Sequence, residues 1–307
     1  MNQDQKASIV YRFDHVTHCE MCGDPVGSHK VLGQRLNTSQ GRHPRRQTGI
    51  TVSVVKCHRC GLVYNQPMPV PVDFQDHYGI DPAEYWNDEY YQLKPDYFSA
   101  EINSAKELLS FAPGMKALDI GASIGKCMIA MQNAGFDTYG IEPSLVFYEK
   151  AISMMKIDPS KLSIGMMEEM EYPENSFDLI TFGAVFEHLY HPAQCLEKAM
   201  KWLKPNGIIH IEIPSARYFV SKIFNLYFSL KGTNYVTNTS PMHVPFHLYE
   251  FDLRSFEALG KKLNFKIERH EFNVCNLMHI PNIARPILRK YMEWTRTGMQ
   301  LTVYLRK

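Results

Sequence analysis

Residues 116–125 constrain the fold more than any other stretch, because an apolar run there passes directly into a glycine-containing turn. The run from Lys116 to Ile120 has the composition of a strand buried on both faces. Gly121 and Gly125 follow, and a helix is expected from about Gly125. Glycines let the backbone approach a ligand closely, and the first turn of a helix offers unpaired N–H groups and a positive dipole end. The stretch therefore predicts a ligand-binding cradle between a strand and a helix.

A second predicted strand, Thr138 to Ile141, ends at Glu142, which lies 21 positions after Gly121. An acid at about this spacing binds the ribose hydroxyls in nucleotide-binding βαβ units. A glycine turn alone is compatible with an ordinary tight loop, but the acid in register favours a nucleoside site. The dinucleotide fingerprint requires three glycines, whereas the turn from Gly121 to Gly125 contains two. A dehydrogenase is therefore the less favoured interpretation.

The turn resembles the D-x-G-x-G-x-G motif of class I S-adenosylmethionine-dependent methyltransferases. Asp119 stands at the acid of that motif, and Ser123 replaces its middle glycine. The segment from Ser176 to Pro192 resembles the S-F-D-x-I…E-H-L-x-x-P signature of the same family. The resemblance covers most of the chain. It implies an α/β fold, a doubly wound seven-stranded Rossmann-like methyltransferase sheet, and methyl transfer from S-adenosyl-L-methionine.

Hydrophobic periodicity predicts the other elements of such a fold. The expected helices cover residues 102–111, 145–155, 192–203, 217–230, 253–263 and 283–294. The expected further strands cover residues 161–164, 176–183, 208–213, 265–272 and 299–305. The aromatic helix at 217–230 is interpreted as a substrate cap, with an oligomer contact as the alternative.

The resemblance also implies which residues bind the cofactor. Gly121 and Gly125 would hold its methionine portion, Asp119 its ammonium group through the turn, and Glu142 its ribose. Residues 166–168 would contact the adenine, with Met167 either beside the ring or in the core. The complete predicted set is Asp119, Gly121, Ala122, Ser123, Gly125, Glu142, Pro143, Met167, Glu168 and Gly183.

Three histidines and one glutamate are the candidates for removing a proton from the acceptor. His243 and His247 lie on one segment after the predicted fifth strand, within a stretch similar to the H-x-x-x-F segment of sugar methyltransferases that carry an N-terminal zinc module. By resemblance, Glu187 and His188 would lie beside the reaction cavity. A helix cap or a buried hydrogen-bonded pair is the alternative for these two residues. Histidine suits proton transfer because its ordinary pKa lies near neutrality.

Two C-x-x-C pairs, each followed by glycine, predict a zinc site near the N-terminus. Cys19 and Cys22 form the first pair, and Cys57 and Cys60 form the second. Four thiolates from two such turns match a closed, structural zinc site, with free or redox-active cysteines as the alternative. The segment between the pairs, residues 34–47, is expected to be an exposed loop that is either solvated or in contact with an anionic ligand. Its arginines are Arg35, Arg42, Arg45 and Arg46.

These motifs divide the chain into three predicted parts. A zinc-ribbon module covers residues 1–66, a connector rich in tyrosine and proline covers 67–96, and the methyltransferase domain covers 97–307 with a cap insertion near 216–250. Aromatic side chains at this density are expected to pack on the main domain. Three tyrosines of the connector are candidates for a lid over the ligand, with interdomain packing as the alternative: Tyr85, Tyr90 and Tyr91.

Composition narrows the range of functions. The 307 residues are 45% hydrophobic and 21% charged, with a formal net charge of +1, which gives no electrostatic argument for nucleic acid or an anionic membrane. The first ten residues lack the apolar core of a signal peptide, so a cytoplasmic protein is expected. The zinc module joined to this domain resembles the arrangement in methyltransferases that modify sugars, and this resemblance implies a sugar-linked small molecule as acceptor. An RNA methyltransferase, an NAD(P)-dependent oxidoreductase and a cofactor-binding scaffold without activity are the alternatives.

Overall fold

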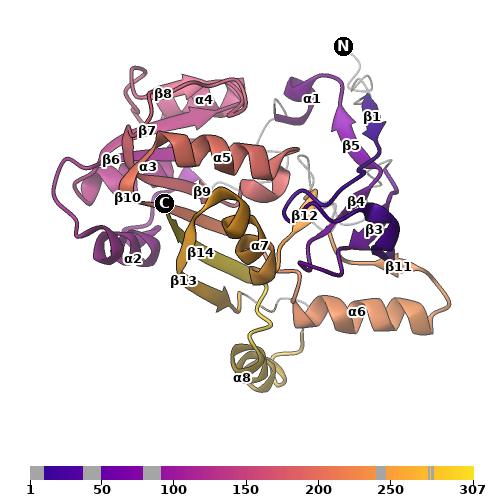
Figure 1. Ribbon diagram of the computed structural model, residues 1–307. Helices are drawn as coiled ribbons and strands as arrows, with labels where there is room; N and C mark the ends of the chain where they lie inside the picture. The colour runs from indigo at the N-terminus through magenta and orange to yellow at the C-terminus, as the bar shows by residue number, and fades with distance from the viewer. Residues whose placement is uncertain (1–9, 37–49, 79–90, 240–246, 276, 278–279) are drawn as a thin grey trace, which may run out of the picture.

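The computed structural model describes residues 10–36, 50–78, 91–239, 247–275, 277 and 280–307. Within these residues, the larger part is a seven-stranded sheet covered by helices. A smaller sheet, built mostly from residues near the N-terminus, lies beside it (Figure 1). One large hydrophobic core cluster contains side chains from both parts, among them Leu62 and Leu118. The two parts therefore pack as one body rather than as separate units on a tether.

The large sheet has the strand order β13-β14-β10-β9-β6-β7-β8. The five strands from β6 to β10 are mutually parallel, and β14 is antiparallel to both β10 and β13. This order confirms the doubly wound, seven-stranded α/β sheet predicted from the sequence. Its strands are β6 (Lys116–Ile120), β7 (Asp137–Glu142), β8 (Leu162–Ile164), β9 (Phe177–Gly183), β10 (Leu203–Pro214), β13 (Lys266–Asn273) and β14 (Gln300–Arg306).

Helices pack on both faces of this sheet because its strands are apolar on both sides. On one face, Ala117 and Leu179 contact the cluster that includes α2 and α3. On the other face, Leu118 and Ile180 belong to the cluster that includes α5 and α7. Adjacent residues of one strand thus face opposite helical layers, as the strand repeat requires. The helices are α2 (Ser99–Leu109), α3 (Lys126–Asn133), α4 (Leu145–Ser153), α5 (Pro192–Trp202) and α7 (Leu253–Leu263).

Strand β10 differs from its prediction, because it begins at Leu203 rather than at residue 208. Leu203 pairs with Phe177 of β9, and the pairing register then shifts before it resumes at Ile208. Residues 204–207, between the predicted helix and the predicted strand, form the interruption between these two pairings, where Asn206 takes a left-handed φ of 64°. Turn residues there bend the strand without ending it.

The smaller sheet has the order β11-β2-β3-β4-β12. Its central strands are β2 (Lys30–Arg35), β3 (Ser53–Lys56) and β4 (Val63–Gln66), whereas β11 (Tyr235–Val236) and β12 (Tyr249–Glu250) come from the insertion after β10. A separate pair, β1 (Tyr11–Asp14) with β5 (Met68–Pro71), extends this part of the molecule. The insertion therefore supplies both edge strands of the small sheet, while the predicted domain boundaries at 66/67 and 96/97 stay predictions.

Arg35 corrects the prediction of an exposed basic loop at residues 34–47. The residue ends β2 and its side chain is fully buried. Strand β11 pairs along β2, with Val236 opposite Arg35, and covers what would otherwise be an exposed edge. Burial lowers the pKa of the Arg35 guanidinium to about 10. The other three arginines of that prediction, Arg42, Arg45 and Arg46, lie outside the described residues.

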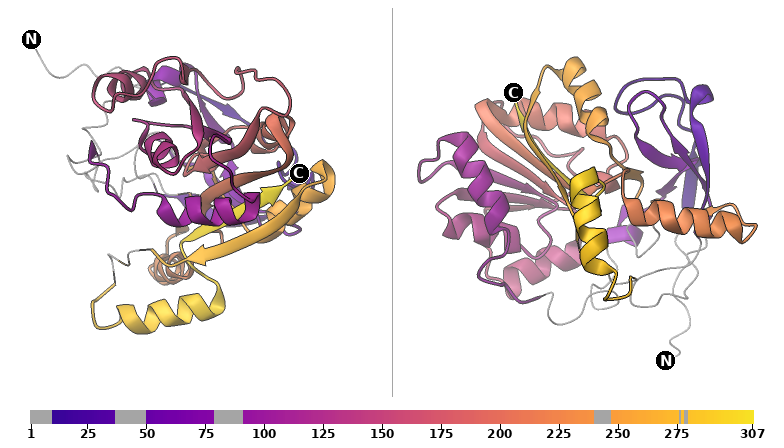
Figure 2. Two further views of the ribbon diagram at one scale, coloured as in Figure 1. Left: turned by 90° about the vertical axis from the view of Figure 1, so that its left-hand side faces the viewer. Right: turned by 90° about the horizontal axis from the view of Figure 1, so that it is seen from below.

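The remaining helices lie at the periphery. They are α1 (Phe74–Tyr78), α6 (Phe219–Leu230) and α8 (Arg285–Thr295). Helices α6 and α8 project on the lower side of the molecule in Figure 1 and are both in open view from below (Figure 2). Across the described part of the chain, no helix combines the length and the apolar character needed to span a membrane.

Candidate functional site

The strand order places the glycine turn at the switch point of the sheet. From β6 the chain proceeds outward through β7 and β8, and it then returns to the other side of β6 with β9 and β10. Ile120 lies opposite Phe182, so the turn at Gly121 and the end of β9 at Gly183 emerge side by side. In open α/β sheets the ligand crevice forms at the carboxyl ends of the strands at this point.

A cavity of about 100 Å³ lies at the switch point. It brings together five residues predicted from the sequence to bind the cofactor, namely Asp119, Gly121, Ala122, Ser123 and Gly183. Sequence analysis missed Tyr97 and Phe98, which line the same cavity, and Lys126, whose Nζ lies 4.9 Å from the centre of the Tyr97 ring. No local pattern distinguishes Tyr97 from the tyrosines of the preceding connector, because only the path of the chain into α2 carries it back to the turn.

The turn requires backbone conformations that favour glycine. Gly121 and Gly125 have φ angles of 71° and 82°, and a Cβ on either would lie within 3 Å of Val185 or Ile157 respectively. The space left by these glycines is therefore filled by protein side chains. Ser123, at the middle glycine of the motif, adopts the same left-handed region with φ of 53°. Ser123 thus keeps the turn geometry in place of the glycine. The residues that could approach a ligand closely are those that line the cavity.

Glu142 fixes the turn through its carboxylate. One oxygen accepts a hydrogen bond from the Ser123 backbone N–H at 2.6 Å, and the other accepts from the Ser144 N–H at 2.7 Å. Burial raises the pKa of Glu142 to about 7, although both hydrogen bonds act in the opposite direction. Pro143 follows directly, and its carbonyl accepts a hydrogen bond from Gln75 of α1 at 2.9 Å. The connector therefore reaches the predicted ribose end of the site.

Asp119 is a buried acid close to Glu142. Its side chain lines the cavity, and the residue is only 4% exposed. Burial and the nearby charge of Glu142 raise the pKa of Asp119 to about 8, against a hydrogen bond with Cys127 that lowers it. Two buried acids side by side favour a ligand that carries positive charge over one that carries pyrophosphate.

Met167 and Glu168, which were predicted to contact the adenine, are not among the residues that line this cavity. Met167 is buried in the main hydrophobic cluster, with 3% of its surface exposed. Glu168 lines a larger cavity of about 420 Å³ between the two parts of the molecule, together with Met166 and Tyr190. The Glu168 Oε1 is 3.5 Å from the Cys195 sulfur. Met167 therefore has the core position that was the alternative for it.

A second group of predicted residues converges just beyond the turn. The short helix Phe186–His188 carries Glu187 and His188, and a hydrogen bond of 2.9 Å from the Leu248 N–H to the Glu187 carbonyl brings His247 beside them. The Glu187 Oε1 is 3.9 Å from His247 Nε2 and 4.0 Å from His188 Nε2. The two imidazole centres are 5.0 Å apart. His243 lies outside the described residues.

Burial distinguishes the members of this Glu187–His188–His247 group. The Glu187 side chain is 2% exposed, whereas those of His188 and His247 are 12% and 25% exposed. Burial, and secondarily the charge of Glu212, raise the pKa of Glu187 to about 8. Among the described residues, none donates a hydrogen bond to Glu187 Oε2. Val185, two residues earlier, contacts Gly121, so the group begins at the wall of the glycine turn.

One connector tyrosine predicted to form a lid is described. Lys150 of α4 lies with its Nζ 5.2 Å from the centre of the Tyr91 ring, so this tyrosine stacks on the helix that follows Glu142. Tyr85 and Tyr90 lie outside the described residues. The contact places Tyr91 against the main domain, whereas its action as a lid stays a prediction.

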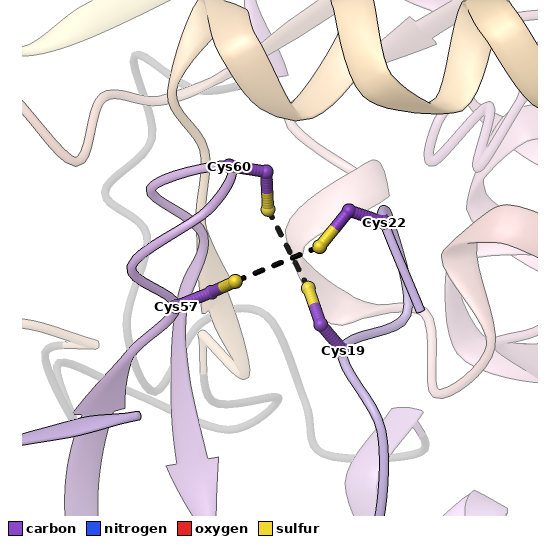
Figure 3. Close-up of side chains that lie close together, drawn as sticks. All are labelled: Cys19, Cys22, Cys57 and Cys60. Carbon is purple, nitrogen blue, oxygen red and sulfur yellow. Dashed lines mark hydrogen bonds between the residues drawn. The ribbon is translucent and has the colours of Figure 1, made fainter. Parts of the chain in front are cut away.

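The four cysteines of the two C-x-x-C pairs meet in one cluster (Figure 3). Cys19 and Cys60 have sulfurs 3.5 Å apart, and those of Cys22 and Cys57 are 3.6 Å apart. A tetrahedral zinc with bonds of about 2.3 Å separates its sulfurs by about 3.8 Å, so the cluster is nearly of the required size. All four residues are buried, which also suits a closed structural site.

The fold and cavity together define a class of protein. A doubly wound sheet with this strand order, two buried acids at the switch point and a turn of the D-x-G-x-G-x-G type describe an enzyme that binds an adenosyl cofactor carrying positive charge. Residues 88–270, more than half of the chain, match the family model of the methyltransferase domain. The chain therefore belongs to the methyltransferase-domain family, and this match favours methyl transfer over the oxidoreductase alternative.

Similar curated proteins are also methyltransferases. Over 109 residues the chain is 29% identical to phosphoethanolamine N-methyltransferase 3 of Arabidopsis thaliana, covering 34% of this chain and 22% of that protein. Over 137 residues it is 28% identical to the ubiquinone biosynthesis O-methyltransferase of Rhodopseudomonas palustris strain TIE-1, covering 43% of this chain and 51% of that protein. The chain thus spans about half or less of the length of these relatives.

A solved structure similar to this chain is the S-adenosylmethionine-dependent methyltransferase from Mesorhizobium loti. It is 15% identical in sequence, with a TM-score of 0.48, and the match covers 70% of this chain and 100% of that chain. A methyltransferase from Methanosarcina mazei gives a TM-score of 0.49 at 13% identity, covering 70% of this chain and 98% of that chain.

Proposed function

We propose that this enzyme transfers the methyl group of S-adenosyl-L-methionine to a hydroxyl of a sugar-linked small molecule. The observation that carries the proposal is the convergence of Glu187, His188 and His247 beside the glycine turn. A hydroxyl group must lose a proton as it becomes methylated, and a histidine supported by a buried carboxylate can accept that proton. The relative from Rhodopseudomonas palustris is named an O-methyltransferase, which also supports oxygen as the acceptor atom.

The acids at the switch point fit the charge of the proposed cofactor. The bound cofactor would supply an electrophilic methyl group on a sulfonium centre. Asp119 would hold the ammonium group through the turn, and Glu142 would accept hydrogen bonds from the ribose hydroxyls. Tyr97 and Phe98 would cover the methionine end and exclude water from it. Because alignment of donor and acceptor contributes strongly to displacement reactions, these residues act mainly by positioning.

The Glu187–His188–His247 group would handle the proton. His247 is the more exposed histidine, so its Nε2 is the better placed to meet an incoming hydroxyl. Proton transfer to that nitrogen leaves an imidazolium, which the Glu187 carboxylate would stabilise where it is ionised; because burial raises the pKa of Glu187 to about 8, this fraction grows as pH rises toward that value. His188 lies at a similar distance from the same carboxylate oxygen and would complete the polar wall.

The four-cysteine cluster would hold a structural zinc ion. Gly23 and Gly61, which follow the second cysteine of each pair, take φ angles of 77° and 80°. The turn at Cys60 packs on α7, where the Ser255 hydroxyl donates a hydrogen bond to the Cys60 carbonyl at 3.1 Å. With all four positions taken by sulfur, such a zinc has no open site for chemistry, and its role would be to fold this segment.

An acceptor screen tests the proposal. The purified chain is incubated with S-adenosylmethionine carrying a labelled methyl group, and with sugar nucleotides, free oligosaccharides, a catechol, phosphoethanolamine or transfer RNA. Label is expected in the sugar-linked compounds. Labelling confined to transfer RNA would support the alternative of an RNA methyltransferase, and labelling confined to the catechol or the amine would overturn the sugar assignment.

Loss of the Glu142 carboxylate is expected to weaken cofactor binding. A charge-assisted hydrogen bond contributes about 1.5–3 kcal/mol, so Glu142→Gln should raise the Kd for S-adenosylmethionine by roughly 10- to 150-fold in calorimetry. Glu142→Ala should have a larger effect, because it also removes the acceptor of the Ser123 N–H that shapes the turn. An unchanged Kd in both variants would contradict the ribose contact and would show that the hydrogen bond from Ser123 is not needed for cofactor binding.

Cofactor affinity is expected to rise with pH. Because the pKa of Asp119 is raised to about 8 in the cofactor-free fold, the acid must lose a proton before it can pair with the ammonium group. The association constant should therefore increase by up to about tenfold per pH unit from about pH 6 toward pH 8. The stability of the fold changes with pH in the opposite direction. Because the pKa of Asp119 is raised in the folded state, its contribution to the free energy of unfolding is present at low pH and is lost as pH rises through the folded-state pKa of about 8. Asp119→Asn should abolish this rise of the association constant with pH. The comparison separates titration of the Asp119 carboxyl from titration of the ligand.

A further inference from the structure

Helices α6 and α8 each present an apolar stripe to solvent. On α6 the exposed residues follow helical spacing at Ile223, Leu226, Tyr227 and Leu230, and Leu230 is 79% exposed. On and just before α8 they are Ile283, Ile287, Tyr291 and Trp294, and Trp294 is 81% exposed. Residues three, four and seven apart share one side of a helix. We call these eight residues the α6–α8 face.

The two helices form one unit because the start of α6 packs against α8. Val220 of α6 and Met292 of α8 belong to the same small hydrophobic cluster, which also contains Val274 and Leu277. The rings of Phe219 and Tyr291 have centres 4.8 Å apart, so Tyr291 is partly covered by α6. Beyond this contact, the stripe of α6 from Ile223 onward and the rest of the α8 stripe are exposed apolar surface. Both helices lie on the same side of the molecule (Figure 2).

Positive charge accompanies this apolar surface. Residues 217–232 contain three basic residues and no acid, and residues 280–297 contain four basic residues and only Glu293 as an acid. Each segment thus has a formal charge of +3, whereas the whole chain has +1. Lys290 lies three residues after Ile287 and four before Trp294, which places it beside the stripe of α8. Lys222 and Lys231 flank the stripe of α6 in the same way.

We propose that the α6–α8 face docks on the surface of an anionic lipid bilayer. Aliphatic and aromatic side chains beside lysine and arginine are the composition of helices that lie in a membrane interface. A second copy fits less well, because a two-fold contact through this face would bring its positive charges together. The expectation of no membrane contact relied on net charge averaged over the chain, which conceals this local excess.

Docking through the α6–α8 face would also set the position of the large sheet relative to the bilayer. Helix α6 begins at Phe219, five residues after β10 ends at Pro214 at the carboxyl edge of the sheet. A docked molecule would therefore hold that edge near the bilayer. The inference goes beyond the proposed function, because binding to lipid can be measured without any acceptor.

Vesicle sedimentation tests the proposal with the full chain. We expect binding to phosphatidylcholine vesicles that contain phosphatidylglycerol and little binding to phosphatidylcholine alone, with release at high salt. Ile287→Ser with Trp294→Ser should reduce the partition coefficient by about tenfold or more, because two deep apolar contacts are lost. Lys222→Gln and Lys290→Gln should each reduce it by roughly fivefold. Val31→Ser and Val72→Ser are matched controls, since these exposed valines belong to β2 and to the residue after β5 and not to either helix.

Three results would overturn the proposal. One is no binding to anionic vesicles at low salt, and another is an equal loss in the control variants. The third is a dimer that forms in sedimentation equilibrium and that Ile287→Ser with Trp294→Ser dissociates, which would identify the face as a subunit contact. Fluorescence gives a second readout, because the difference spectrum between the wild type and Trp294→Phe should shift to the blue when anionic vesicles are added.

Discussion

His247→Ala is expected to lower kcat by about 10²- to 10⁴-fold while leaving the Kd for S-adenosylmethionine unchanged. The reason is geometric, because His247 lies beside Glu187 and just beyond the glycine turn, yet it does not line the cavity at that turn. Single-turnover measurements with labelled cofactor give the rate, and calorimetry gives the Kd. A lower kcat together with a raised Kd would indicate a structural role for His247.

Matched variants separate proton transfer from other causes. Glu187→Gln keeps the shape of the side chain and removes its charge, so kcat should fall and its pH dependence should change. His191→Ala is the control, because this exposed histidine pairs with Glu20 instead of Glu187. If His188→Ala abolishes turnover and His247→Ala does not, then His188 is the base. Full activity in both variants would remove the proposed base altogether.

Loss of one cysteine ligand is expected to unfold the N-terminal sheet. The purified chain should contain about one zinc, and Cys57→Ser should contain none. Zinc binding contributes about 10–16 kcal/mol to folding in zinc-finger peptides, which is comparable with the roughly 5–15 kcal/mol that stabilises a typical domain. Metal analysis and thermal unfolding of both proteins measure the effect.

Cys275→Ser is the control for this experiment. Cys275 lies away from the four-cysteine cluster, with its sulfur 3.2 Å from Gln300 Oε1. This variant should keep both zinc and stability. Metal-free wild-type protein with an unchanged unfolding temperature would contradict the structural zinc, and it would leave the cluster as four packed thiols.

The methyltransferase sheet could be predicted from the sequence because its signals are local. An apolar strand, a glycine turn and an acid at fixed spacing are set by residues close together in the chain, and Asp119, Gly121 and Gly183 lie where this pattern places them. Family resemblance suggested Glu187, His188 and His247 as separate candidates. No local rule shows that His188 and His247, 59 positions apart, approach the same carboxylate oxygen of Glu187.

The small sheet illustrates why the rest could not be predicted. Arg35 was assigned to an exposed loop because its neighbours in sequence are polar and basic, but β11 buries it from a position 200 residues later. Two-residue strands such as β11 and β12 carry no periodic signal of their own. Their pairing is decided by tertiary contacts, which also explains why β2 extends into residues that read as a loop.

The origin of β11 and β12 has a consequence for biosynthesis. During translation the central strands of the small sheet leave the ribosome long before residues 235–250 can pair with either edge. Until then the nascent chain carries open hydrogen-bonding edges, which are sites for aggregation. A fragment that ends before residue 235 should therefore be poorly soluble with or without metal, and the two parts of this enzyme should be produced as one polypeptide.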